Sequence, residues 1–212
     1  MAFLFAVPVS GQKHFVGLKG GLNLTKVFGK NFEAEIFSKN GLVTGLTYQY
    51  DFNDNFHLGM DFIFSQKGFK SDIIFINEDG NAIGNGEPSS FIYNYIAFPV
   101  KGGFSFGNKL RGFVNIGIFP AFLIKAKTEI PTGENGEPIT LDYDDFATKN
   151  DFGGLMETGV TYKITNRFLL YVSLEYQQSL ISITNDKYLP GAELKSYGVS
   201  ASLGVKYSIT KN

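Results

Sequence analysis

Apolar and polar residues alternate with a period of two along most of the chain. In the clearest segment, every second residue from Phe168 to Tyr176 is large and apolar, and the residues between them include Ser173 and Glu175. This alternation predicts β-strands with one apolar face. About eight such segments occur, and no helical period of comparable quality appears. They cover residues 16–25, 42–50, 57–67, 91–106, 110–126, 151–164, 168–177 and 198–209. The sequence therefore predicts an all-β chain.

The connections between these strands alternate in length. Residues 51–55, 107–109 and 165–167 are short and rich in Asn, Asp and Gly, which is typical of tight turns. The long polar connections cover residues 29–40, 70–90, 127–150 and 182–196. Strict alternation places all short turns at one end, as in outer-membrane barrels. We therefore expect an eight-stranded antiparallel up-and-down transmembrane β-barrel with short periplasmic turns and four longer extracellular loops.

The apolar face is expected to contact lipid. Alternation also fits a soluble lipocalin-like barrel, whose apolar face points inward. However, the polar face here is mostly Gly, Ser, Thr, Asn and Gln, with fewer charges than a water-exposed surface carries. Aromatic residues also gather in two belts, as at membrane interfaces. The belt beside the short turns comprises Tyr50, Phe52, Phe56, Phe104, Phe106, Tyr162, Phe168 and Tyr207, and the belt beside the long loops comprises Phe64, Phe91, Phe122, Phe152, Tyr176 and Tyr197.

Two prolines fall inside predicted strands. Pro99 and Pro120 each remove a donor from the hydrogen-bond ladder. We expect both to mark bulges or bends of the barrel.

The first residues are similar to a secretory leader. An apolar run over residues 3–9 is followed by the small residues Ser10 and Gly11, as in an h-region and a cleavage site. A positively charged n-region is missing from the sequence. We interpret residues 1–11 as a partial signal peptide and residues 12–212 as the barrel domain, exported to the outer membrane of a Gram-negative cell.

Composition excludes several classes of function. The net charge of −1 gives no basic footprint, so nucleic acid is not an expected partner. There is no Cys, so a disulfide framework, a thiolate nucleophile and a Cys-based zinc site are excluded.

The two histidines offer little to catalysis. A serine nucleophile needs a neighbouring base, and only His14 and His57 are available. His14 lies at the leader junction. His57 shares a face with Ser65, but eight residues of strand separate them by about 26 Å, which leaves only a serine from another strand. We expect His57 to be a polar residue near a turn, and we expect no catalytic, cofactor-binding or metal-binding site.

Several charged residues are expected inside the barrel. They are Lys19, Asp61, Lys101, Glu157, Glu175 and Lys206. An eight-stranded barrel has room for little besides its own side chains, so we expect these residues to pair with one another, in preference to forming a proton relay or a channel. The acidic loop 129–145 carries Glu134, Glu137, Asp142, Asp144 and Asp145 without EF-hand spacing. Cation binding there stays open.

Three segments resemble PorT-like outer-membrane β-barrel proteins. The sequence GLKGGLNL at residues 17–24 resembles the opening strand of that family. The sequence YIAFPV at residues 95–100 is similar to its Tyr-Leu-Glu-Ile-Pro-Leu strand, with Ala97 where Glu is usual, and residues 151–153 are similar to its sixth strand. The resemblance implies an outer-membrane barrel and, through the family's namesake, a link to protein secretion.

The expected function is that of a non-catalytic, monomeric outer-membrane barrel. Its extracellular loops would serve scaffolding, binding, envelope assembly or secretion, and its partners would be outer-membrane lipid and proteins of the envelope or secretion machinery. An outer-membrane lipid-modifying enzyme and a soluble lipocalin-like ligand-binding barrel are the alternatives.

Overall fold

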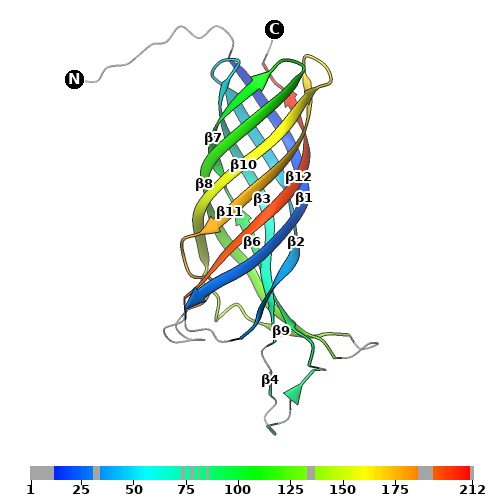
Figure 1. The fold of residues 1–212 in the computed structure, drawn as a ribbon, viewed down its shortest axis with the longest axis vertical. Helices are drawn as coiled ribbons and strands as arrows, with labels where there is room; N and C mark the ends of the chain where they lie inside the picture. Colours follow the sequence, from blue (N-terminus) through cyan, green and yellow to red (C-terminus); the bar gives the residue numbers. More distant parts are fainter. Residues whose placement is uncertain are drawn as a thin grey trace, which may run out of the picture.

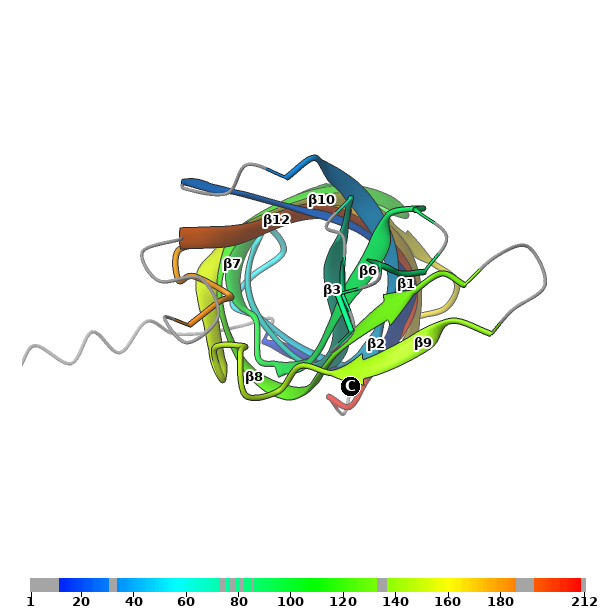
Figure 2. The same cartoon turned by 90° about the horizontal axis from the view of Figure 1, so that it is seen from below.

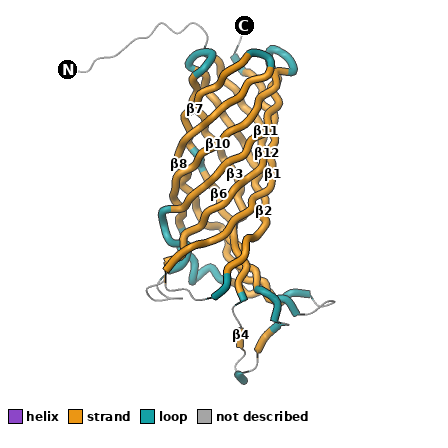
Figure 3. The backbone as a smooth tube through the Cα atoms, in the orientation of Figure 1, coloured by secondary structure: helices purple, strands orange, loops and turns teal. Residues whose placement is uncertain are grey.

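The computed structural model describes residues 12–30, 34–72, 75–76, 79–80, 82–84, 86–132, 137–185 and 193–210. In this part of the chain the regular elements are all strands (Figure 3). They are β1 (Lys13–Lys30), β2 (Ile36–Asp51), β3 (Phe56–Ser71), β4 (Phe75–Ile76), β5 (Ala82–Ile83), β6 (Ser89–Ala97), β7 (Val100–Gly107), β8 (Leu110–Ile130), β9 (Ile139–Asp142), β10 (Asn150–Lys163), β11 (Phe168–Ser179) and β12 (Glu193–Ser208). Among these residues no helix is long and apolar enough to span a membrane.

The strands close into an antiparallel barrel (Figure 1). β1 pairs with β2 on one side and with β12 on the other, and β10 joins β8 to β11. β6 and β7 follow one another as a single wall element between β3 and β8, which brings the ring to eight members. The view along the barrel shows the ring complete (Figure 2). Closure satisfies the backbone groups internally, as hydrocarbon surroundings require. The predicted eight-stranded antiparallel up-and-down barrel is confirmed.

One of the predicted long loops is wrong. β1 extends to Lys30 and β2 begins at Ile36, so five residues connect them in place of the predicted loop 29–40. The outer part of β2, residues 36–41, does not alternate regularly but still pairs with β3, from Ile36 opposite Ser71. Outside the hydrocarbon region, backbone hydrogen bonds hold a strand in the sheet and it needs no apolar face. Alternation therefore ends before the strand does. Several strands are therefore longer than the alternating segments that predicted them: β1 has 18 residues where alternation covers 16–25, and β8 has 21 where it covers 110–126.

The prolines do not mark bulges. The register of β7 and β6 against β3 and β8 runs unchanged across Pro99 and Pro120. The Asp61 amide donates to the Pro99 carbonyl and the Phe98 amide donates to the Pro120 carbonyl, both at 2.9 Å. The register shifts lie elsewhere, at Ile124 of β8 and between Ser38 and Val43 of β2. Each proline costs one donor without changing the pairing.

The apolar face of the barrel points outward. Large apolar side chains line the outside of the wall, including Ile116 at 68% and Leu203 at 63% exposure. The inner face carries the buried polar residues that alternation assigned to the lumen. This distribution contradicts a soluble barrel with an apolar interior. The assignment of Phe91 to the aromatic belt beside the long loops is wrong. Phe91 lies inside the barrel, with its ring stacked on that of Phe69 and the ring centres 4.7 Å apart.

Candidate functional site

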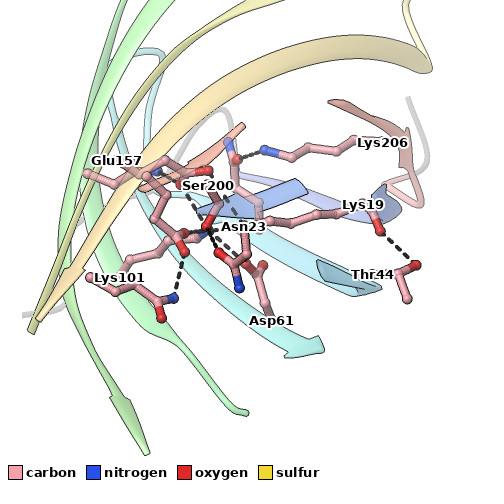
Figure 4. A network of polar contacts seen from close by, with 12 residues as sticks. Lys19, Asn23, Thr44, Asp61, Lys101, Glu157, Ser200 and Lys206 are labelled. Carbon is pink, nitrogen blue, oxygen red and sulfur yellow. Dashed lines mark hydrogen bonds and ion pairs between the residues drawn. The ribbon is translucent and has the colours of Figure 1, made fainter. Parts of the chain in front are cut away.

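Five charged side chains meet near the middle of the lumen. Figure 4 labels four of them, Lys19, Asp61, Lys101 and Glu157. The Lys101 ammonium lies 2.8 Å from Asp61 Oδ2 and 2.8 Å from Glu157 Oε2. The Lys19 ammonium lies 3.2 Å from Glu175 Oε2 and 3.4 Å from Asp61 Oδ2. The two longer pairs are Lys19 with Glu157 and Lys101 with Glu175, at 3.9 and 3.7 Å. Both lysines therefore contact all three carboxylates. The predicted pairing is confirmed for these five residues, which we call the charge cluster.

The strand register explains why the charge cluster forms. Lys19, Asp61, Lys101, Glu157 and Glu175 come from β1, β3, β7, β10 and β11, and each points inward at nearly the same height. Glu157 and Glu175 are cross-strand partners, which alone would repel. The two ammonium groups between the carboxylates offset this repulsion. Desolvation opposes the Coulombic gain of such buried pairs, so their presence alone is weak evidence of added stability.

Lys206 departs from the predicted network. Its ammonium donates to Gln49 Oε1 at 2.6 Å and lies 4.4 Å from the centre of the Tyr171 ring. Within the described residues it has no carboxylate inside the 4.0 Å limit of an ion pair. Lys206 is buried toward the short-turn end, beyond the charge cluster.

A hydrogen-bonded chain joins His57 to the charge cluster. Ser105 Oγ lies 3.3 Å from His57 Nδ1, and His57 Nε2 lies 2.7 Å from Asn115 Oδ1. The amide nitrogen of Asn115 donates to Glu157 Oε2 at 2.8 Å. The sequence left open a serine from another strand as the partner of His57, and the structure identifies it as Ser105. The pairing of His57 with Gly103 places β7 beside β3 and brings Ser105 to the ring.

His14 lies on the outside of the barrel. Its Nδ1 is 2.8 Å from the Tyr48 hydroxyl, and its ring centre is 4.9 Å from that of Tyr50. It belongs to the aromatic belt beside the short turns and is remote from the lumen.

The outer half of the lumen is filled by an aromatic plug. We use this name for Phe69, Phe91, Tyr93, Tyr95 and Phe119, which are all at most 2% exposed. Residues of the outer connections, among them Tyr143 and Ile183, pack against the plug from above. Sequence reasoning missed it because residues 91–98 are apolar on both faces, so alternation shows no inner side there. The signal was the density of aromatic residues in β6.

Two carboxylates of the acidic loop 129–145 form ion pairs with Lys125. The Lys125 ammonium lies 2.7 Å from Asp142 and 3.6 Å from Asp144. In the described ranges no group of three or more His, Cys, Asp or Glu residues could hold a metal ion. Glu134 lies outside those ranges.

Comparison with known proteins identifies the family. The model of the outer membrane protein beta-barrel domain family matches residues 11–185. The chain belongs to this family. Its place is therefore the outer membrane, and its long apolar exterior faces lipid.

Solved structures similar to this outer-membrane barrel share little sequence with it. Neisserial surface protein A is 13% identical over 93% of this chain and 99% of its own, with a TM-score of 0.49. Ail, the attachment invasion locus protein of Yersinia pestis, is 14% identical over the same shares, with a TM-score of 0.46. The outer membrane protein AlkL is 13% identical over 100% of this chain and 98% of its own, with a TM-score of 0.47. The sequence has no match among curated proteins.

Proposed function

We propose that this outer-membrane barrel is non-catalytic and acts by binding or scaffolding other envelope components through its outer connections. The observation that supports this is the filled lumen. The charge cluster occupies its middle and the aromatic plug its outer half. Between them the void beside Asn23 and Lys67 measures about 10 Å³, which is about the space of one water. Solutes thus have no continuous passage through the described part of the barrel. Its interactions with other molecules must therefore take place at its two ends.

The outer end offers the larger surface. β9 pairs with the end of β8 and extends the wall beyond the barrel (Figure 1). All four residues of β9 are exposed, and Ile139 and Leu141 are apolar. Apolar side chains held beyond the membrane on a rigid strand suit contact with another protein, where such residues form the core of an interface. The resemblance to PorT-like proteins supports a partner from envelope assembly or secretion.

Export is part of the same proposal. Residues 1–11 carry the apolar run and small residues of a leader, and they lie outside the described residues. We propose that they are the remainder of a signal peptide removed before the barrel inserts.

The test is site-specific photocrosslinking in intact cells. A photoreactive residue replaces Leu141 of β9, and the matched control replaces Leu203, which is exposed on the lipid-facing wall. We expect one discrete protein adduct at position 141 and no protein adduct at position 203. Adducts absent from both positions in a correctly folded barrel would overturn a partner at β9.

Conductance tests the filled lumen separately. Purified barrel inserted into a planar lipid bilayer should carry no stable current, because neither the charge cluster nor the plug leaves a passage. Discrete open-channel currents from the unmodified protein would show a conducting function and contradict the proposal.

A second candidate, a lipid-modifying enzyme, draws on the contact between Ser105 and His57. The ring joins Ser105 to Asn115 in the order that a serine nucleophile uses, with a base and an orienting group. Both side chains are buried, however, and the adjoining void of about 20 Å³ leaves no room for an acyl chain. We expect Ser105→Ala and His57→Gln to leave the lipid composition of the outer membrane unchanged. Loss of a lipid modification in both variants would favour the enzyme.

A further inference from the structure

The barrel contains a cavity at its short-turn end. It has a volume of about 390 Å³, which lies within the range of small-molecule sites. The short turns, the first residue of β1 and the inner ends of β8, β10 and β11 surround it. In outer-membrane barrels this end faces the periplasm. The cavity is therefore open to periplasmic solutes and is separated from lipid by the barrel wall.

Cationic groups outnumber carboxylates in the cavity wall. Lys13, Arg111 and Lys163 line it together with Asp51 and Asp54. Lys109 also lines it, but its ammonium lies 5.4 Å from the centre of the Tyr162 ring on the outer face. The carboxylate of Asp51 already accepts a hydrogen bond from Gln49 Nε2 at 2.6 Å.

A buried ammonium lies beneath the cavity. The small void beside Lys206 shares four lining residues with the cavity, namely Asp51, Arg111, Thr161 and Leu169. Lys206 is 9% exposed and has Gln49 as its hydrogen-bond acceptor, with no carboxylate of the described residues within ion-pair distance. A buried charge without a counter-charge is costly. Lys206 does not line the cavity itself, but its positive charge lies behind the four shared residues and favours an anion in the cavity over a cation.

Arg111 supplies a second unsatisfied donor. One terminal nitrogen of its guanidinium donates to the Asp54 carbonyl, while its Nε is buried and has no hydrogen-bond acceptor among the described residues. A guanidinium offers parallel N–H groups whose spacing matches the oxygens of a phosphate or a carboxylate. Only one terminal nitrogen has a recorded acceptor, so the guanidinium keeps donor capacity toward the cavity that it lines.

We propose that this cavity is a periplasmic binding site for a small solute that carries a phosphate or carboxylate group. Arg111 would donate to the oxyanion, Lys163 and Lys13 would lie beside it, and Lys206 would add its charge from the adjoining void behind the wall. A lipid headgroup is not the source, because the barrel wall separates the cavity from the bilayer. The site is independent of the partner surface at β9, which lies at the opposite end (Figure 1).

The test is a titration of the full barrel, folded in non-ionic detergent, with inorganic pyrophosphate and in parallel with citrate. Isothermal titration calorimetry and the ³¹P chemical shift of pyrophosphate report binding. We expect saturable binding of at least one of the two anions, and at least a tenfold loss of affinity in Arg111→Gln. Because Arg111 also bonds to a turn, Lys163→Gln, an exposed residue of the same wall, serves as the second variant and should lose at least threefold.

Lys70→Gln is the matched control, because Lys70 is exposed at the opposite end of the barrel. It should bind pyrophosphate and citrate as the unmodified barrel does. The proposal is overturned if neither anion binds saturably, if Lys163→Gln and any folded Arg111→Gln bind as tightly as the unmodified protein, or if Lys70→Gln loses as much affinity as they do.

Discussion

The ammonium of Lys67 lies 4.1 Å from the centre of the Phe119 ring. This contact joins the polar part of the lumen to the aromatic plug, because the same ammonium forms an ion pair with Asp151 at 2.9 Å. Asp151 also accepts a hydrogen bond from Ser179 at 3.0 Å. A cation over a ring face is attracted by the π-electron density, more so when water is excluded. Lys67 thus stabilises the plug from beneath with both its charge and its methylene chain.

We predict that Lys67 and Asp151 are strongly coupled. Lys67→Met leaves a buried carboxylate without its cation and should lower the free energy of unfolding by about 3–5 kcal/mol. The double variant Lys67→Met with Asp151→Asn should lose less than the sum of the two single variants. Urea unfolding in lipid vesicles, followed by heat-modifiable gel migration, measures each value. Additive losses would show that the pair does not interact.

The charge cluster should respond differently to loss of a cation and loss of an anion. It contains two ammonium groups and three carboxylates, so Lys101→Met leaves three carboxylates around Lys19 alone. We expect Lys101→Met to destabilise the barrel by about 3–5 kcal/mol. Glu157→Gln leaves two cations with two anions and should cost less than about 2 kcal/mol. The same unfolding assay compares them, and equal losses would contradict the proposed charge balance.

Two adjacent glycines of β7 should differ sharply in their tolerance of a methyl group. A Cβ on Gly103 would clash with Asn115 Oδ1 and with His57 Nε2, whereas a Cβ on Gly102 would meet nothing within 4 Å. We expect Gly103→Ala to break the hydrogen bond between His57 and Asn115 and to destabilise the barrel by about 1–3 kcal/mol. Gly102→Ala should be neutral. A stable Gly103→Ala variant with an unchanged His57 NMR signal would contradict the inward position of His57.

The outward direction of the apolar face is testable by depth. Ile116 lies near the middle of the lipid-facing part of β8, and Leu110 lies at its short-turn end. We expect Ile116→Arg to cost about 2–4 kcal/mol in lipid vesicles, because the charge enters the hydrocarbon midplane. Leu110→Arg, on the same face, should cost about 0–1 kcal/mol. If both variants lower the free energy of unfolding equally, the two positions do not lie at different depths in the membrane.

The sequence by itself determined the barrel and the direction of its faces. Alternation from Phe168 to Tyr176 is a local property, because neighbouring residues of a strand always point to opposite sides. The three short turns and the inward positions of Lys19, Asp61 and Glu157 follow from the same rule. Where both faces are apolar, as in β6, the rule gives no direction, and the aromatic plug could not be predicted. Where a strand leaves the membrane, as in the outer part of β2, the rule ends before the strand.

Only the tertiary structure decided which inward residues meet. Alternation gives the side of each residue but not its height in the barrel, which depends on the register between strands. The register of β7 against β3 brings Ser105 to His57, 48 positions away in sequence. Strand register also places Lys206 closer to the short-turn end, outside the charge cluster and beside the cavity. Lys206 is nevertheless an inward lysine of an alternating strand, as Lys19 is. Contacts across the lumen join residues distant in the chain, and their geometry is fixed only when the sheet closes.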